Sequence, residues 1–523
     1  MQTINHLPDD IIHMIILYLP TSNICNFIMA SKHLYNTYNS SAVVWKSHCA
    51  LYPYSGITYL EQIYSYKSDA QKWKSISQDI SGIMQMDVLH WVGCLYRSID
   101  SLLASQEGHA ICMLDDFFLV SVEGWGSNSE NLEIIDTTTL PYITKINCIS
   151  EIPDSMSFTY GFSLSRINDR CLLKYGGCSE GGYRRAVNDM CVISISLCDE
   201  NDKLVTGARY TKPVAGKATY RPITVERNEQ STEMLPWPRG YHTATCISLN
   251  NAPTMLVFGG LGPPTTPQLL EFIGDNEGVE PDPAFLQHMQ QTLTRPLTRL
   301  ECLDTTTMQW RRVHASGTEP CPRFGHSCSY HPSTDRLIFI SGSDGSDLLR
   351  NGTELNDIHI LSIIRGEFGN DSLVWSTPKL FPRSPCESAR DLLPGRCHCA
   401  CLAGNKIITF GGSAEISNAV TVIDISSAND IFLLSPEVKG HSEPAPRISS
   451  TGALVGKYFL VYGGYNSTER ELGDAWLLDL SYSTASYRGE EHEAETTQQE
   501  NEFGYYKLYE EAFKDLRNEC IIT

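Results

Sequence analysis

The side chains best suited to metal binding or catalysis in this 523-residue chain lie in the run RCHCAC, residues 396–401. Closely spaced thiols suggest a metal site. In an extended strand, however, Cys397, Cys399 and Cys401 would point to one side, with the outer two about 13 Å apart. Zinc–sulfur bonds of about 2.3 Å cannot gather sulfurs held that far apart. We therefore interpret the run as part of a strand and expect no metal.

Three histidines recur at matching positions: His242, His326 and His398. We interpret them as buried imidazoles of a repeat, bonded to backbone, and not as catalytic bases. The chain contains no GxSxG, HExxH, P-loop or dinucleotide-binding motif. The acidic stretch SDGSD, residues 343–347, is too short for a calcium loop. We predict a non-catalytic protein with no catalytic residues and no cofactor.

Composition narrows the function classes further. The formal net charge of −21 and the pI near 5.1 argue against nucleic-acid binding. The longest apolar run, residues 11–19, is too short to span a membrane, and no targeting signal is visible. The 18 cysteines are spread through strand-like segments, as small buried residues would be. We expect a protein of a reducing compartment, the cytoplasm or the nucleus, without a membrane partner.

An internal repeat fills most of the chain. A short apolar run ending in glycine returns six times, as FFLVSVEGWG (117–126), CLLKYGG (171–177), MLVFGG (255–260), LIFISGS (337–343), KIITFGG (406–412) and YFLVYGG (457–464). A second strand-like piece precedes several copies, a third often ends in Asp, and a fourth carries Trp. The pattern predicts four-stranded antiparallel sheets stacked around an axis, because one such sheet cannot bury both of its faces.

These features resemble the Kelch repeat family, which has a glycine doublet, a later aromatic residue and about 50 residues per unit. The resemblance covers residues 109–482 and implies a mainly β fold, a Kelch-type β-propeller with six recognisable blades. The residues alone leave open whether six units close the ring or whether residues 82–108 hide a seventh.

Extra length between the repeats is expected to emerge at one end of the propeller. Residues 263–298 and 343–355 lie between second and third strands, and residues 199–235 and 376–393 lie between units. We interpret this end as a binding face. The alternative is that this end tolerates insertions because the other end is obstructed.

Arg239, Arg323, Arg396 and Arg447 lie just before first strands, at the same end. The Kelch resemblance implies that side chains here contact acidic or polar ligands, so these arginines are the predicted target-binding residues. They suggest an acidic or phosphorylated target. The alternative is that they bridge blades or cap carbonyl groups.

The N-terminal stretch LPDDIIHMIILYLP, residues 7–20, is a predicted helix that is apolar on two sides. Pro8 suits a helix start, Asp9 and Asp10 suit its first turn, and Pro20 ends it. Two further short helices, from about Ser22 and in SSAVVWKSHCALY, can cover only one apolar side. Leaving the other side in water forgoes on the order of 10 kcal/mol, so a partner surface is expected.

This segment, with Leu34 and VVWKSHC, resembles an F-box over residues 3–53. The resemblance implies docking to the linker subunit of SCF ubiquitin ligases, and through it to a cullin. It assigns the docking surface to six residues: Leu7, Pro8, Ile11, Ile15, Ile16 and Leu19. The alternative is a helical lead-in that packs on the propeller.

The predicted organisation is thus a small all-α F-box domain (1–55), a linker (56–108), the Kelch propeller (109–482) and an acidic tail (483–523) that is partly disordered or helical. From residue 488 onward the tail holds ten acidic and four basic side chains, a net charge of 4 − 10 = −6. The last unit lacks an obvious fourth strand. Either the linker supplies a strand that closes the ring or FGYYKLYEEAFKDL, in the tail, does so.

The favoured hypothesis is a substrate receptor of an SCF-type ubiquitin ligase, which holds a protein target on the insertion-rich face. Two alternatives remain: a Kelch interaction scaffold that is not committed to degradation, and a propeller enzyme.

Overall fold

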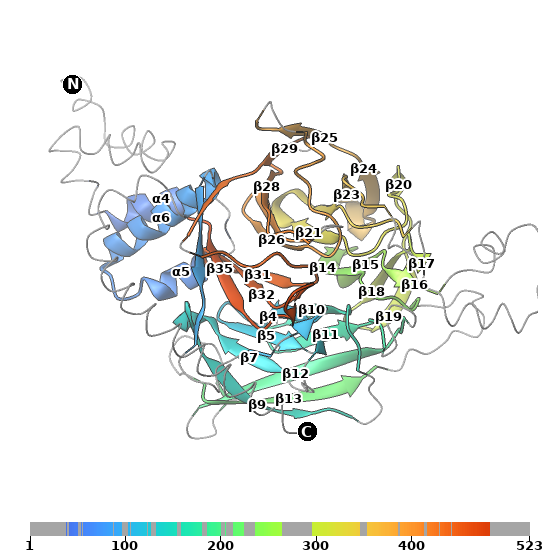
Figure 1. Ribbon diagram of the computed structural model, residues 1–523, viewed down its shortest axis with the longest axis horizontal. Coiled ribbons are helices and arrows are strands. Elements are labelled where there is room, and N and C mark those ends of the chain that lie inside the picture. The colour runs from blue at the N-terminus through green and yellow to red at the C-terminus, as the bar shows by residue number, and fades with distance from the viewer. Residues whose placement is uncertain are drawn as a thin grey trace, which may run out of the picture.

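The computed structural model describes most of the chain between residues 38 and 481 (Figure 1). The described residues are 38, 41–50, 54, 56–86, 88–96, 103–104, 106–122, 124–126, 132–153, 158–179, 186–199, 204–205, 213–223, 236–263, 295–345, 353–384, 388–412, 416–427, 429–440 and 442–481. Sheets surround a common centre, and helices lie at the periphery beside β35 (Ala475–Asp479).

Six four-stranded antiparallel sheets, here called blades 1 to 6, make up the propeller in the described residues. Blade 1 comprises β4 (Ala110–Met113), β5 (Phe118–Val122), β7 (Glu133–Asp136) and β9 (Lys145–Glu151). Blade 2 comprises β10 (Ser163–Asn168), β11 (Cys171–Tyr175), β12 (Met190–Cys198) and β13 (Ala215–Pro222). Blade 3 comprises β14 (Thr243–Leu249), β15 (Ala252–Phe258), β18 (Leu300–Asp304) and β19 (Gln309–Arg312).

Blades 4 to 6 follow the same pattern. Blade 4 comprises β21 (Ser327–His331), β22 (Arg336–Ile340), β23 (Ile358–Ile364) and β24 (Ser372–Ser376). Blade 5 comprises β26 (Cys399–Ala403), β27 (Lys406–Phe410), β28 (Val420–Asp424) and β29 (Asp430–Leu434). Blade 6 comprises β31 (Thr451–Val455), β32 (Tyr458–Tyr462), β35 and β1 (Val88–Gly93). First strands begin at one end of the propeller, here called the mouth face, and end at the other, the opposite face.

The six blades form a closed ring. Each first strand contacts the first strand of the next blade, and β31 contacts β4 to complete the circle. The residue two positions before each first strand donates its backbone N–H to the carbonyl of the equivalent residue in the preceding blade, at distances of 2.6 to 3.2 Å. We call these residues the inner ring: Gly108, Gly161, Tyr241, Gly325, Cys397 and Ser449. All six have positive φ, between 54° and 64°. The circle of hydrogen bonds therefore holds the same backbone conformation at this position in every blade. The described residues contain no seventh blade.

The glycine doublets are required by two close approaches, one from the next blade and one from the start of the same blade. Gly260 donates its N–H to the carbonyl of Arg323 at 2.8 Å. Its φ is 92°, and an added Cβ would lie 2.7 Å from the Cβ of His242. At Gly259 an added Cβ would lie 2.7 Å from the same Arg323 oxygen. Only glycine readily adopts this backbone conformation and also fits in the space available, because it has no Cβ.

The Asp that often ends a third strand caps the following turn. Asp304 accepts hydrogen bonds from the N–H groups of Thr306 and Thr307 at 2.8 and 3.0 Å. Asp136, Asp424 and Asp479 accept equivalent bonds in their own blades. These carboxylates replace backbone partners in a tight turn.

Most outer edges are covered by additional pairing. Three short strands lie parallel to the fourth strands of blades 4, 5 and 6, namely β20 (Ser316–Gly317), β25 (Lys379–Pro382) and β30 (Glu437–Lys439). In blades 1 and 2 the fourth strands β9 and β13 pair with each other, which gives one eight-stranded sheet. This pairing leaves few open edges.

Four two-stranded sheets and three 3-10 helices complete the described elements. The pairs are β2 (Leu95–Tyr96) with β8 (Tyr142–Ile143), β3 (Gln106–Glu107) with β6 (Trp125–Gly126), β16 (Leu261–Gly262) with β17 (Arg295–Pro296), and β33 (Tyr465–Asn466) with β34 (Arg470–Glu471). The 3-10 helices are η3 (Thr137–Thr139), η4 (Pro332–Thr334) and η5 (Glu367–Gly369).

The fourth strand of blade 6 comes from the N-terminal side of the chain. β1 pairs antiparallel with β35, from His90 opposite Asp479 to Gly93 opposite Trp476. The segment that could have supplied a seventh blade therefore supplies the missing strand. The competing candidate in the C-terminal tail lies outside the described residues.

Three described helices precede β1: α4 (Ala42–Ala50), α5 (Ile57–Ile63) and α6 (Asp69–Gln85). α6 is amphipathic, and its buried residues Trp73, Ile76, Ile80 and Ile83 follow helical spacing. No helix in the described part of the chain is both long and apolar enough to cross a membrane.

One expected insertion lies at the other end of the propeller. The sequence interpretation placed residues 199–235 between two units, on the mouth face. The structure places β13 inside this range, so residues 199–214 connect the third strand to the fourth and belong to the opposite face. The error arose because β13, AGKATYRP, lacks the apolar alternation and the Trp used as markers. The insertions after β15 and β22 do belong to the mouth face.

Candidate binding site at the channel mouth

The six residues that directly precede the inner-ring residues lie around the mouth of the central channel. In blades 1, 5 and 6 these residues are Glu107, Arg396 and Ile448, all partly exposed. Blades 2 and 4 contribute buried Tyr160 and Phe324, and blade 3 contributes Gly240. The mouth thus presents one acid, one base and apolar surface, all held by the hydrogen-bonded inner ring.

Two carboxylates dominate the chemistry of the mouth. Glu354 accepts hydrogen bonds from the backbone N–H and from the guanidinium of Arg396, at 2.7 and 2.8 Å. Burial raises the pKa of Glu107, and the nearby Glu471 raises it further. The negative charges of Glu354 and Glu107 both lie close enough to Cys397 to raise the pKa of its thiol. The mouth can therefore hold a polar or charged ligand.

Cys397 is a poor candidate for a nucleophile at this site. It is partly exposed, yet the loss of solvent around its thiol raises its pKa to about 12. A thiol must ionise to attack a substrate or to ligate a metal. Within the described part of the chain, no group of three or more His, Cys, Asp or Glu residues is arranged to hold a metal ion.

Three of the four arginines predicted to bind a target are buried inside the propeller. The side chains of Arg239, Arg323 and Arg447 are all 0% exposed. Arg323 donates two hydrogen bonds to Asp357, at 2.7 and 3.0 Å, and one to the carbonyl of Ser341 at 3.0 Å. Arg447 repeats this arrangement with Asp474 and Gly463.

Arg239 follows the same design. It lies 2.7 Å from Glu301, and it donates to the carbonyl of Gly259 at 3.0 Å. Each of these arginines thus ties the start of a first strand to the glycine doublet and to the third strand of its own blade. Their guanidinium groups offer no surface to a partner, which corresponds to the alternative in which they cap carbonyl groups within the blades.

Arg396 occupies a different position from the other three. Relative to the inner ring, Gly395 takes the place of Arg239, so Arg396 lies one residue closer to the first strand. Its side chain is 15% exposed and pairs with Glu354 at the mouth. Of the four predicted arginines, Arg396 is the one available to a ligand.

The recurring histidines connect neighbouring blades. His242, His326 and His398 lie 2.8 to 2.9 Å from the hydroxyls of Ser163, Thr243 and Ser327 in the preceding blade. Burial lowers the pKa of all three, that of His398 to about 4. They are therefore neutral, and they bond mainly to side chains where the sequence interpretation expected backbone. His109 extends the series in blade 1, bonding Thr451 at 3.3 Å.

Sequence reasoning missed the acidic partners of these arginines and the carboxylates of the mouth. A signal for the former was present, since Asp357 and Asp474 directly precede third strands and Glu301 lies within one. No comparable signal marks Glu107 or Glu354, because each belongs to a loop or a two-residue strand whose place depends on the ring.

A second functional region is the junction between the helices and the propeller. Lys457, in the hairpin of blade 6, lies 3.6 Å from Asp79 on α6 and 3.2 Å from Asp479. Tyr64 donates a hydrogen bond to Asp79 at 2.7 Å. Lys406 of blade 5 donates to the carbonyl of Gln85 at 2.8 Å. These contacts fix α6 against the opposite face.

Close packing reinforces this junction. The hydroxyl of Tyr54 donates to the carbonyl of Gly456, and that of Tyr59 donates to the carbonyl of Thr137 at 2.8 Å. At Gly82 an added Cβ would lie 2.2 Å from the carbonyl oxygen of Ser481. Only residues 86 and 87 separate α6 from β1, so no free linker joins the helices to the propeller. The helices also occupy part of the opposite face, as the obstruction alternative had supposed.

The six residues predicted to dock the ligase linker subunit, namely Leu7, Pro8, Ile11, Ile15, Ile16 and Leu19, lie outside the described residues. α4 lies within SSAVVWKSHCALY, and its Trp45 is fully buried.

Comparison with known proteins bears on both regions. Residues 4–40 match the F-box domain family. Residues 286–487 match the KLHDC2/KLHL20/DRC7 Kelch-repeats domain family. The "Rab9 effector protein with kelch motifs" of Mus musculus is 27% identical over 187 residues, which cover 34% of this chain and 43% of that protein. The "Host cell factor" of Drosophila melanogaster is 27% identical over 272 residues, which cover 48% of this chain and 14% of that protein.

The matched segments thus span less than half the length of these curated relatives. They support the repeat architecture. The activities of these relatives are not assigned to this chain. The two family matches and the closed ring of four-stranded blades lead to one conclusion: the chain carries an F-box domain followed by a Kelch β-propeller, and it is an F-box/Kelch protein.

Proposed function

We propose that this chain is the substrate-recognition subunit of an SCF-type ubiquitin ligase. The F-box, through the apolar helix that contains Ile15 and Leu19, would bind the linker subunit and through it the cullin. The mouth face would hold a protein target. The chain would catalyse no bond chemistry itself, and it would act in the cytoplasm or nucleus.

The observation that carries this proposal is the direct packing of α6 against blades 5 and 6. The helices pack on the opposite face, and the channel mouth opens at the other end of the same body. A ligase acts on a bound target by proximity, because two sites on one rigid body raise the local concentration of the reacting groups. A junction without a free linker maintains that geometry.

At the mouth, we propose Glu107 and Arg396 as the first target contacts. A ligand with a carboxylate or phosphate would compete with Glu354 for Arg396, whereas a ligand with a basic group would pair with Glu107. The buried Arg239, Arg323 and Arg447 would act indirectly, by holding the blades that present the mouth.

The test is a pulldown of the full chain and of an Ile15→Asp, Leu19→Asp variant, probed for the SCF linker and cullin subunits. The matched control is Ile149→Asp, Ile364→Asp, since these two side chains are 72% and 52% exposed on the propeller. We expect the wild type and the control to retain the subunits and the F-box variant to lose them while remaining folded. If the wild type retains neither subunit, the receptor proposal fails, and a Kelch interaction scaffold becomes the better account.

A further inference from the structure

A groove runs along the rim of the propeller between blades 3 and 4. It consists of two adjoining hollows of about 280 and 90 Å³ that share Val313 and His314. Leu249, Val313 and Leu373 give it an apolar floor. We call this feature the rim groove. It lies away from both the channel mouth and the helices, and neither family match assigns it a role.

The charged side chains that line the rim groove carry a small net positive charge. Three arginines line it, Arg299, Arg311 and Arg312, and they face two acids, Glu319 and Asp371. Arg311, Arg312 and His314 are solvent exposed. In a chain with a net charge of −21, this is a local reversal of sign.

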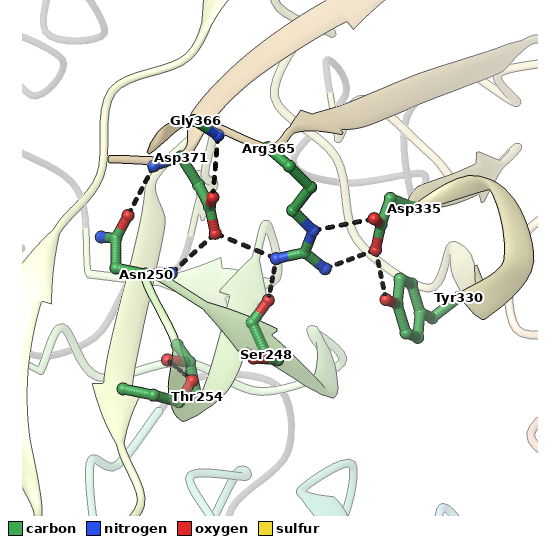
Figure 2. A network of polar contacts seen from close by, with 9 residues as sticks. Ser248, Asn250, Thr254, Tyr330, Asp335, Arg365, Gly366 and Asp371 are labelled. Carbon is green, nitrogen blue, oxygen red and sulfur yellow. Dashed lines mark hydrogen bonds and ion pairs between the residues drawn. The ribbon is translucent and has the colours of Figure 1, made fainter. Parts of the chain in front are cut away.

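The acid in the wall of the groove is already neutralised. Figure 2 shows the carboxylate of Asp371 held by Arg365 at 2.9 Å and by the backbone N–H of Asn250 at 2.7 Å. The side chain of Asp371 is 4% exposed, so it repels an incoming anion weakly. Asn250 in turn accepts the N–H of Asp371 at 2.8 Å. These hydrogen bonds hold the wall within the chain itself, without a ligand.

We propose that the acidic stretch of the C-terminal tail, residues 490–502, docks in the rim groove of its own molecule. This stretch, EEHEAETTQQENE, contains six Glu and neither Lys nor Arg. Its carboxylates complement the arginines, which bind such groups in fixed planar geometry. The aromatic residues that follow, in FGYYKLY, suit the apolar floor.

The position where the described chain ends makes this contact reachable. β35 runs toward the opposite face, and Ser481 lies against Gly82 of α6 there. The rim groove begins at that same face, at Leu249 and Asn250, which end the first strand of blade 3. At about 3.4 Å per residue, residues 490 and 502 reach roughly 30 and 70 Å from Ser481. A folded body of about 400 residues has a radius of gyration of roughly 21 Å. Because β1 closes the ring, the tail is also not needed as the last strand of blade 6.

The test is hydrogen exchange of residues 309–317, measured in the full chain and in a chain that ends at Tyr487. We expect exchange about tenfold faster in the truncated chain, because the docked tail protects the backbone of the crossing between blades 3 and 4. In the full chain, replacing all six Glu of 490–502 with Gln should accelerate exchange to the same extent. Raising the salt concentration should also accelerate the exchange of residues 309–317 in the full chain, since salt screens exposed charges.

A charge swap separates direct pairing from a general loss of structure. Arg311→Glu with Arg312→Glu should release the tail, and six Glu→Lys changes in the tail of that variant should restore protection. Equal exchange at 309–317 in the full and truncated chains would overturn the proposal. So would protection that appears only at high protein concentration, since the occupant would then be the tail of a second copy. The proposal does not depend on the ligase function.

Discussion

The two ends of the propeller are held together in different ways. At the mouth face the same backbone hydrogen bond repeats in all six blades, and one Arg–carboxylate pair recurs in blades 3, 4 and 6. At the opposite face the Asp-capped turn repeats in blades 1, 3, 5 and 6, but the contacts that join other parts of the chain occur once, as in the Lys457 cluster on α6 and the Arg365 network of Figure 2. A repeated bond builds a symmetric frame, and unique contacts place one partner at one site. The fold thus separates the construction of the ring from the attachment of helices α5 and α6.

The largest predicted effect tests the repeated arginine pair. Arg239→Ala should lower the free energy of unfolding by about 3 to 5 kcal/mol, because Glu301 would remain buried without its partner. Both side chains are 0% exposed. The matched substitution is Arg396→Ala, whose side chain is 15% exposed and which should cost about 1 kcal/mol. Denaturant unfolding measures both. Equal costs for the two variants would remove the distinction between a frame arginine and a mouth arginine.

The second prediction concerns the glycine doublets. Gly260→Ala should destabilise the fold by about 2 kcal/mol or more, because its backbone conformation is strained for any other residue. The added Cβ would also meet His242. Gly93→Ala is the control, since its nearest neighbour would lie 3.6 Å away, at Trp476. Thermal unfolding of the two variants compares them. A harmless Gly260→Ala would show that the segment before β14, which contains His242, can move away from the end of β15.

The third prediction follows from the buried histidines. Their pKa values are lowered in the folded state, so the unfolded chain takes up protons below about pH 6.5 while the folded chain does not. Stability should therefore be highest above pH 6.5 and fall as the pH decreases, by about 1.4 kcal/mol per pH unit for each histidine. His398→Gln should reduce this slope by that amount between about pH 6 and pH 5.

Urea unfolding over this pH range measures the slope. The wild type, measured over the same pH range, is the reference. An unaltered slope in His398→Gln would mean that this imidazole is not held neutral by the ring.

The smallest effect is predicted at the opposite face. Arg365 is 40% exposed although it pairs with both Asp335 and Asp371. Arg365→Ala should therefore cost about 1 kcal/mol, as exposed ion pairs contribute little. The loss in free energy of unfolding caused by Arg365→Ala should be smaller still at high salt, because salt screens exposed charges. A loss as large as that of Arg239→Ala would place this network among the frame contacts and weaken the comparison.

The repeat architecture could be predicted from the sequence, and several of the contacts could not. Glycine doublets and apolar runs are local signals, and each marks the same turn in its blade. The pairing of β9 with β13, by contrast, joins the outer strands of two blades and has no local signal. The shift of Arg396 by one residue was hidden because PGR and PR look equivalent until the inner ring fixes the register. The partners of Arg239, Arg323 and Arg447 lie 27 to 62 residues downstream, across an insertion in two of the three blades.

In the proposed function, this chain joins a ligase at its F-box to a target at its mouth. The most direct measurement is the half-life of every protein recovered with the full chain, in cells that carry either the wild type or the Ile15→Asp, Leu19→Asp variant. The account predicts a small set of proteins that bind both forms equally and survive several-fold longer with the variant. Bound proteins whose half-lives are the same in both cells would contradict it.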